Sequence, residues 1–280
     1  MFQSLERRVM LAVSAAFDSG VLTVTGTAIA DTIRLDLLPG GLRTFVTVKS
    51  DNVVIYTNSG NSDVVTTLNL DAQAGNDMIT FSADQSTAAL NIIGGDGADT
   101  ISGSFVESTM FKITGGKGDD KINVSVALQN SRRSAINGSD GNDCIRVMNT
   151  AGPSPYVQGG AGNDVINLTA NDVADPYDVD GFKVSAGTGN DTVRGSNQDD
   201  VLLGEEGNDR IYGNDGDDVI YGGTGGDIFY GGAGDDFIDT GGDGYGDSML
   251  DYTDGGDGFD IAILGFRDDL RVFNVEDVLS

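Results

Sequence analysis

The sequence from residue 186 to residue 239 reads AGTGNDTVR, GSNQDDVLL, GEEGNDRIY, GNDGDDVIY, GGTGGDIFY and GGAGDDFID, six nonapeptides with no residue between them. Asp stands in the sixth place of every nonapeptide, an apolar residue in the eighth, and Gly in the first place of all but one. A repeat this short cannot bury an apolar face alone, so it predicts a solenoid in which each unit packs against its neighbours.

The same nine-residue word recurs upstream at intervals of 21 to 27 residues. These copies are AQAGNDMIT from Ala72, GGDGADTIS from Gly94, GGKGDDKIN from Gly115, GSDGNDCIR from Gly138 and GGAGNDVIN from Gly159. In each copy an apolar residue stands two positions before the word, nine residues ahead of the apolar residue inside it. One half of every turn therefore has a constant length, whereas the other half varies until residue 186.

This register predicts two short strands per turn, each pointing a β-branched or Leu side chain into a shared core. One inward column is Ile79, Ile101, Ile122, Ile145, Ile166, Val193, Ile211 and Phe229. The facing column is Leu70, Ile92, Ile113, Ile136, Val157, Val184, Leu202, Ile220 and Ile238. The predicted fold is all-β: a right-handed parallel β-roll or β-helix solenoid with capping segments at both ends.

The chain divides into five predicted parts. They are a targeting or capping segment over 1–20, a first turn plus hairpin insertion over 21–71, a β-roll with one regular edge and one variable-loop edge over 72–185, a regular roll over 186–239, and degenerate repeats with a C-terminal cap over 240–280. The hairpin is predicted from FVTVKSDNVVIYT, which starts at Phe45 and alternates apolar and polar residues.

The formal net charge is −28, and residues 186–280 contain 23 acidic and 4 basic side chains. This charge excludes nucleic acid and anionic membranes as expected partners. Cys144 is the single cysteine and His is absent, so neither an intramolecular disulfide nor a zinc-type ligand set is available. No apolar run reaches the roughly 18 residues of a membrane-spanning helix.

Carboxylates in the sixth place of stacked turns are predicted to lie about 4.8 Å apart, close enough to repel one another strongly. Gly in the first, second and fourth places permits positive φ and lets carbonyl oxygens turn inward. Calcium takes six to eight such oxygens, and two adjacent loops supply them together. The predicted metal ligands are Asp77, Asp99, Asp120, Asp143, Asp164, Asp191, Asp200, Asp209, Asp218, Asp227 and Asp236.

Fifth-place residues admit two interpretations. Their side chains are either supplementary ligands or residues that tolerate the turn conformation. The set is Asn76, Asp119, Asn142, Asn163, Asn190, Asp199, Asn208, Asp217 and Asp235.

The repeated word resembles the RTX, or haemolysin-type, calcium-binding nonapeptide G-G-x-G-x-D-x-U-x. The resemblance covers residues 72–239 and implies a calcium turn in the first six residues, a ligand in the sixth-place Asp, and a strand in the last three. It also implies export and folding outside the cell, where calcium is abundant. Ala72, Ser139, Ala186, Ser196 and Glu205 stand where the family has turn glycines, and Gln198 replaces a fourth-place Gly.

The N-terminal segment MFQSLERRVMLAVSAAF has two arginines before a short apolar run, as an export signal does. It also resembles the LEPR-XLL segment of exported bacterial surface proteins, with Arg7 in place of Pro and Met10 in place of Leu. The alternative is an amphipathic helix that caps the roll.

Two functions are consistent with this sequence. The first is a secreted or surface-associated structural or interaction module that folds on calcium, without enzymatic activity, with a cell-surface polymer or envelope protein as a candidate partner. The second is an enzyme similar to parallel β-helix polysaccharide lyases or epimerases, whose turns have comparable lengths. The absence of His and the scatter of Lys and Arg favour the first.

Overall fold

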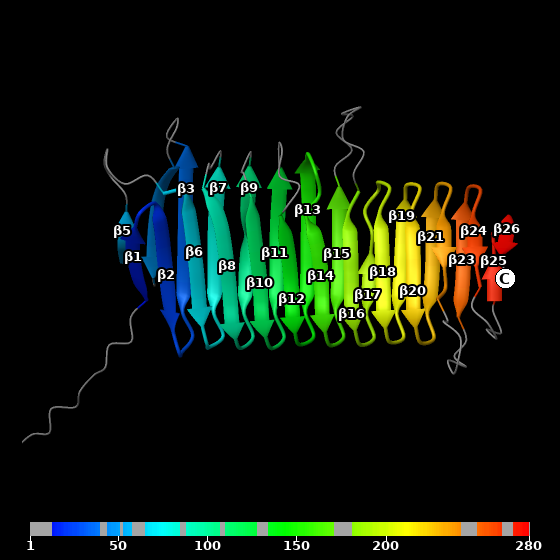
Figure 1. The fold of residues 1–280 in the computed structure, drawn as a ribbon, viewed down its shortest axis with the longest axis horizontal. Coiled ribbons are helices and arrows are strands. Elements are labelled where there is room, and N and C mark those ends of the chain that lie inside the picture. The colour runs from blue at the N-terminus through cyan, green and yellow to red at the C-terminus, as the bar shows by residue number, and fades with distance from the viewer. Residues whose placement is uncertain are drawn as a thin grey trace, which may run out of the picture.

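A computed structural model describes residues 13–39, 44–50, 53–57, 65–84, 88–106, 110–127, 134–170, 181–241, 251–264 and 271–279. These residues form a long, flattened solenoid of stacked strands (Figure 1). None of them is helical, so no described helix is available to cross a membrane. The predicted all-β, parallel solenoid is confirmed.

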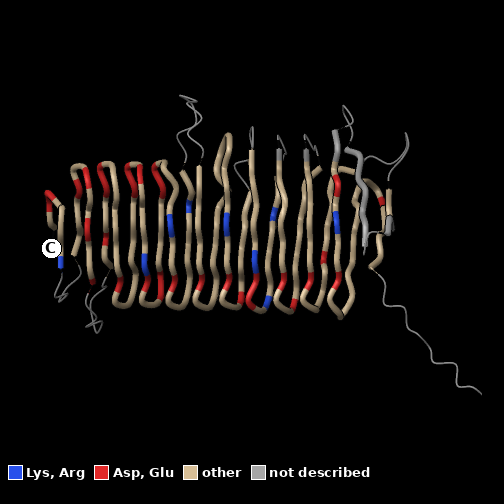
Figure 2. The backbone as a smooth tube through the Cα atoms, turned by 180° about the vertical axis from the view of Figure 1, so that it is seen from behind, with Lys and Arg blue, Asp and Glu red and all other residues tan. Residues whose placement is uncertain are grey.

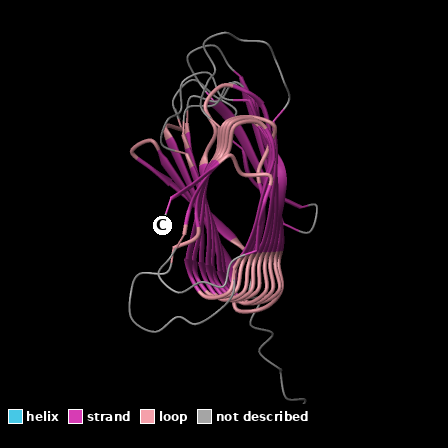
Figure 3. Cartoon of the chain, turned by 90° about the vertical axis from the view of Figure 1, so that its right-hand side faces the viewer, coloured by secondary structure: helices cyan, strands magenta, loops and turns pink. Residues whose placement is uncertain are grey.

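The described strands form two sheets that face each other across the core (Figure 3). Sheet A contains, in order, β1 (Ser14–Asp18), β2 (Val21–Thr27), β6 (Thr67–Gln73), β8 (Ala89–Asp96), β10 (Phe111–Lys117), β12 (Ala135–Asp140), β14 (Tyr156–Ala161), β16 (Lys183–Thr188), β18 (Val201–Glu206), β20 (Val219–Thr224), β22 (Phe237–Asp239), β24 (Ile261–Ile263) and β26 (Asp277–Leu279). Sheet B contains β25 (Arg271–Phe273), β23 (Tyr252–Asp257), β21 (Ile228–Ala233), β19 (Arg210–Asp215), β17 (Thr192–Arg194), β15 (Val165–Ala170), β13 (Cys144–Ala151), β11 (Lys121–Ala127), β9 (Thr100–Val106), β7 (Met78–Asp84), β3 (Thr32–Pro39), β4 (Thr44–Ser50) and β5 (Val53–Thr57).

Neighbouring strands pair in parallel from β2 and β3 to the C-terminal end of each sheet. At the N-terminal end, β1 pairs antiparallel with β2, and β4 and β5 form an antiparallel hairpin beside β3. The hairpin lies where the Phe45 segment was expected to insert. At the other end, β25 and β26 add one more rung to the stack, where a cap was expected. Residues 1–12, which include most of the segment predicted to be a targeting or capping segment, lie outside the described residues.

We call the turns that lead from sheet A to sheet B the first edge, and those from sheet B to sheet A the second edge. Both inward columns predicted from the sequence are buried. Their register is also correct, because Ile122 pairs with Ile101 and Ile145, and Ile113 pairs with Ile92 and Ile136.

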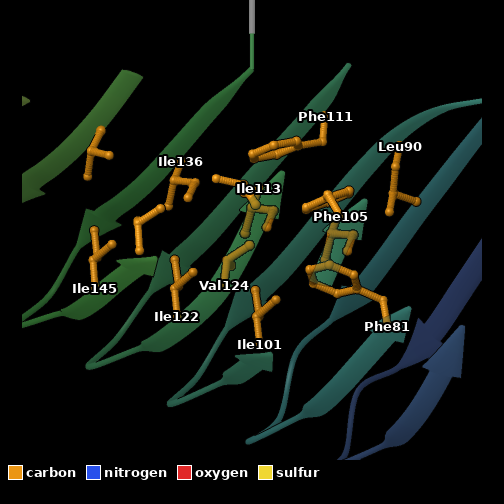
Figure 4. Close-up of a cluster of buried hydrophobic side chains, with 14 of the residues drawn as sticks. Phe81, Leu90, Ile101, Phe105, Phe111, Ile113, Ile122, Val124, Ile136 and Ile145 are labelled. Carbon is orange, nitrogen blue, oxygen red and sulfur yellow. The ribbon is translucent and has the colours of Figure 1, made fainter. Parts of the chain in front are cut away.

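Turns in the N-terminal half of the roll bury more hydrophobic side chains than the regular nonapeptide turns in the C-terminal half. The turn formed by β10 and β11 buries Phe111, Ile113, Ile122 and Val124 (Figure 4). It also buries Val126. Phe111 stacks on Phe105 with ring centroids 4.0 Å apart, and Phe105 lies 4.7 Å from Phe81.

The turn formed by β18 and β19 buries only Leu202 and Ile211 among its hydrophobic residues. Full burial of such a side chain is worth about 1.5–3 kcal/mol, so three fewer per turn is a substantial loss of stabilisation. The regular nonapeptide turns therefore need another source of stability.

Candidate metal site

The sixth-place Asp residues form one continuous column along the first edge. Each carboxylate Oδ1 accepts the backbone N–H of the equivalent Asp one turn closer to the N-terminus, with N to O distances of 2.6–2.8 Å. The accepting residues are Asp77, Asp99, Asp120, Asp143, Asp164, Asp191, Asp209, Asp227 and Asp251.

A second, shorter column follows the second edge. It contains Asp200, Asp218, Asp236 and Asp260 and ends in Glu276, whose Oε2 accepts the N–H of Asp260 at 2.8 Å. Figure 2 shows acidic residues along one edge over the length of the roll and along the other edge only towards the C-terminus. All eleven predicted ligands therefore lie in these two columns.

The second carboxylate oxygen distinguishes most of these residues from ordinary capping aspartates. It is buried and has no hydrogen-bond donor in Asp77, Asp99, Asp120, Asp143, Asp164, Asp191, Asp209, Asp218, Asp236 and Asp260. Each of these side chains is at most 2 % exposed. A buried ionised oxygen without a donor is strongly unfavourable, so it calls for a proton or a cation.

Burial raises the pKa of these carboxyl groups, and neighbouring carboxylates raise it further. The pKa of Asp77 rises to about 6, those of Asp120, Asp164 and Asp236 to about 7, and that of Asp218 to about 8. The backbone N–H bond to Oδ1 opposes the rise in each case. The sequence predicted mutual repulsion as the cost of the column, but loss of hydration is the larger cause.

First-place glycines leave room for oxygens from two different turns to converge. A Cβ on Gly204 would lie 2.5 Å from Oδ2 of Asp209 and 2.6 Å from the carbonyl oxygen of Gly222 in the next turn. Such distances are incompatible with a carbon atom, so the position requires glycine. The oxygens that surround it belong to the hard, mixed carboxylate and carbonyl type that calcium prefers.

Asp200 is the exception among the predicted ligands. Its Oδ2 accepts the backbone N–H of Ser196 at 2.6 Å and the Ser196 hydroxyl at 3.1 Å, and its Oδ1 accepts the N–H of Phe182 at 2.6 Å. Asp31 has the same arrangement with Thr27 at the start of the first column. In both columns, the first carboxylate is thus satisfied by a hydroxyl residue four positions earlier in the chain.

The fifth-place side chains form a ladder that runs in the opposite direction. Each of the nine residues named above accepts, through Oδ1, the backbone N–H of the fifth-place residue in the following turn at 2.6–3.0 Å. This ladder gives each side chain a role within the turn itself, which favours the second interpretation over that of supplementary ligands.

No three acidic or cysteine side chains among the described residues are grouped closely enough to hold a metal ion. Any cation must therefore combine isolated carboxylates with backbone carbonyl oxygens. The residues present fit that requirement, because buried Oδ2 atoms without donors lie beside carbonyls of the neighbouring turn.

Four segments match the family described as RTX calcium-binding nonapeptide repeat, namely residues 91–105, 156–172, 185–220 and 212–244. The chain carries RTX repeats. Repeats of this family bind several calcium ions, and the turns that follow Gly115 and Gly138, outside the matched segments, have the same ladder geometry as those within them. No curated protein matches the chain.

Sequence reasoning did not include Asp31, Asp251, Asp260 and Glu276 in the columns. Asp260 had a clear signal, because GGDGFDIAI from Gly255 follows the RTX word apart from Ala262 in the apolar place. Asp251 lacked one, since a longer connection precedes it and Thr253 occupies the inward position.

Proposed function

We propose that this protein is an exported structural or interaction module whose RTX repeats fold when calcium binds between their turns. The observation that carries the proposal is the pair of columns of buried carboxylate oxygens without hydrogen-bond donors. The proposed ligands are the eleven sixth-place residues Asp77, Asp99, Asp120, Asp143, Asp164, Asp191, Asp200, Asp209, Asp218, Asp227 and Asp236. Among them, Asp200 has the weakest need for an ion, because Ser196 already satisfies it.

Folding and binding are coupled in this proposal, because the site is assembled from turns far apart in the unfolded chain. Ions that bind only the folded chain shift the equilibrium towards it in proportion to their concentration. Low calcium would keep the chain unfolded before export, and the higher concentration outside the cell would fold it. The proposed localisation is therefore extracellular or at the cell surface.

The five-part division from the sequence remains part of the proposal. Its support is the change at residue 186, where the second edge begins to use the nonapeptide turn and the second acidic column starts soon afterwards, at Asp200. The densest calcium binding is proposed for residues 186–239, where both edges carry sixth-place carboxylates.

We propose no catalytic role. RTX repeats are structural calcium-binding units, and the strongly perturbed carboxyl groups in the described part of the chain belong to the two columns. The partner is proposed to be a cell-surface polymer or an envelope protein.

A matched pair of substitutions tests the proposed ligands. Asp218→Asn removes a buried charge but keeps an oxygen that can accept the Asp200 N–H, whereas Asp215→Asn removes an exposed charge three residues away. Calorimetric titration should show about one calcium ion fewer per chain, or a clearly weaker site, for Asp218→Asn alone. Equal binding by both variants would contradict the assignment.

A further inference from the structure

Part of the outer face of sheet B is basic in an otherwise acidic molecule. Alternation along β11, β13, β15, β17 and β19 points every second side chain away from the core, and strand pairing aligns these side chains in two rows. The first row contains Lys121, Cys144, Val165, Thr192 and Arg210. The second row contains Asn123, Arg146, Asn167, Arg194 and Tyr212. We call these ten residues the basic face.

The basic face reverses the charge balance of the chain. It has four cations and no acidic residue, although the whole sequence has 44 acidic and only 16 basic side chains. The cations are all exposed, and they are Lys121, Arg146, Arg194 and Arg210. The ion pairs found within the described part of the chain lie elsewhere, so these four charges have no carboxylate partner there. The fold therefore gathers cations that are scattered in the sequence.

The two arginines in the middle of the strands lie well away from the acidic edges. Arg146 follows Asp143 of the first column by three residues, and Arg194 follows Asp191 by three, which is about 10 Å along a strand. Salt at physiological concentration screens exposed charges over about 8 Å. Figure 2 shows Lys and Arg residues along the strands and Asp and Glu residues gathered near the edges. The positive charge of the face is therefore effective locally.

The side chains around the two arginines offer hydrogen bonds and no aromatic platform. Asn167 lies between Arg146 and Arg194 and presents an amide that both donates and accepts. The ring of Tyr212 is covered by Arg194, whose Cζ lies 4.7 Å from the ring centroid, and by Tyr230, whose centroid lies 5.0 Å away with the ring planes within 7°. Nucleotide bases therefore cannot stack on this ring as they do in single-strand binding sites.

The spacing of the cations fits a ligand with few charges. Arg146 and Arg194 are two strands apart, about 10 Å, and the four cations span four strand spacings, about 19 Å. Duplex DNA carries a phosphate about every 1.7 Å and a single strand about every 3.4 Å, so most phosphates would face a chain of charge −28 without a cation. A polysaccharide with an acidic group on every sugar or every second sugar has fewer charges and supplies hydroxyls for the amide of Asn167.

We propose that the basic face binds an acidic polysaccharide. Its carboxylate or sulfate groups contact Arg146 and Arg194, and the hydroxyls between them contact Asn167. This inference rests on the proposed function and gives its polymer partner a chemical class and a surface. Because the rows are assembled from five separate turns, the polymer binds only the folded roll. Calcium in the two columns also lowers the negative charge that the polymer approaches.

Two double variants of equal net charge separate the basic face from the charge of the whole chain. Arg146→Gln with Arg194→Gln removes two cations from the basic face. Lys112→Gln with Lys183→Gln removes two exposed cations from the outer face of sheet A. Circular dichroism in calcium verifies that both variants fold like the wild type. Arg146→Gln alone leaves the contact between Arg194 and Tyr212 in place and replaces the first double variant if that variant does not fold.

The test is a binding titration of the full chain at saturating calcium with hyaluronan fragments and with carboxymethyl dextran. Dextran is the neutral probe, and poly-glutamate is an acidic polymer without sugars. The wild type should bind both acidic glycans more tightly than the other two polymers, and more weakly in concentrated potassium chloride because salt screens the contacts. Loss of Arg146 and Arg194 should weaken binding by at least about tenfold, and the sheet A variant should weaken it by less than about twofold.

Three results would overturn this inference and leave the proposed function intact. They are equal binding by the two double variants, no binding of either acidic glycan by the calcium-folded wild type, and binding of poly-glutamate as tight as that of the glycans. The last result would mean that the face recognises acidic chains without regard to sugars. A wild type that neither binds calcium nor folds in response to it would instead overturn the proposed function.

Discussion

At the scale of single residues, the described sixth-place Asp residues differ in whether a hydrogen-bond donor reaches the buried Oδ2 atom. Ser196 and Thr27 donate to Asp200 and Asp31, whereas Gly in the same place leaves Asp99 and Asp120 without such a donor. A hydroxyl residue in the second place is not sufficient for this, because Ser139 occupies that place in the word of Asp143 and leaves its Oδ2 without a donor.

Replacing Ser196 with Ala should destabilise the folded chain at any calcium concentration. The substitution removes a hydroxyl that donates to a buried carboxylate, which is worth about 1.5–3 kcal/mol. Urea denaturation at fixed, saturating calcium measures the loss. Thr224→Ala, which removes an exposed hydroxyl from the third place of another word, should change the free energy of unfolding by less than about 0.5 kcal/mol. Equal effects of the two substitutions would contradict a stabilising hydrogen bond from the Ser196 hydroxyl to Asp200.

Replacing Gly204 with Ala should raise the calcium concentration needed for folding. A methyl group there would lie within 2.6 Å of both Oδ2 of Asp209 and the Gly222 carbonyl oxygen, so one of these oxygens must move. We expect a shift of the folding midpoint by at least about tenfold, comparable to an overpacked core. The control is the reverse change, Ala186→Gly, at the same place one turn earlier, which should not raise the midpoint. A Gly204→Ala midpoint equal to that of the wild type would contradict the close approach of these two oxygens to Gly204.

At the scale of strands and turns, apolar burial and acidic burial change in opposite directions along the roll. The turn of β10 and β11 buries five hydrophobic side chains beside one column of carboxylates, whereas the turn of β18 and β19 buries two and faces both columns. Turns that bury few apolar groups and many charges are the ones that a bound cation must stabilise.

Partial removal of calcium should therefore open the roll from its regular turns. Amides in residues 186–241 should lose protection from hydrogen exchange at a higher calcium concentration than amides in residues 88–170. The intact chain is allowed to exchange hydrogen in calcium-buffered solutions and is then cleaved by a protease. Mass spectrometry of the peptides gives the calcium concentration at which each region loses protection, both from one sample. Loss of protection at one calcium concentration throughout would contradict a difference between the halves.

Much of this element-level arrangement follows from sequence spacing. The constant spacing of nine positions between paired apolar residues predicted that Ile113 faces Ile122, and the structure confirms that both are buried. The aromatic cluster of Phe81, Phe105 and Phe111 could not be predicted, because it depends on how far strands extend into the variable edge. The hydrogen bond from the Ser196 hydroxyl to Asp200 was also not predicted, because only the folded turn places this hydroxyl beside the carboxylate.

At the scale of the whole molecule, the buried carboxyl groups couple folding to pH. Their folded-state pKa values, such as about 7 for Asp164 and about 8 for Asp218, exceed the ordinary aspartate value of 3.8. A raised pKa contributes stability that is fully present below the unfolded value and is lost as pH rises through the folded value. In the absence of calcium, protons therefore favour the folded chain and ionisation opposes it.

The calcium-free chain should accordingly be more folded at about pH 5 than at about pH 8.5, a range that spans these pKa values. Calcium and protons compete for the same oxygens, so the folded chain should bind calcium more weakly as the pH falls. Circular dichroism in buffers depleted of calcium by a chelating resin checks the first statement. A calcium-free signal independent of pH would contradict the burial of ionisable oxygens.

The most direct test of the account is a titration of the chelator-stripped full chain with calcium, followed by far-ultraviolet circular dichroism, with magnesium in parallel. Magnesium controls for general screening of a charge of −28, because it demands a stricter geometry and gives up water reluctantly. The account predicts a cooperative gain of β-sheet signal with calcium and little gain with magnesium. A stripped chain that already shows the full β-sheet signal near neutral pH and does not respond to calcium would contradict it.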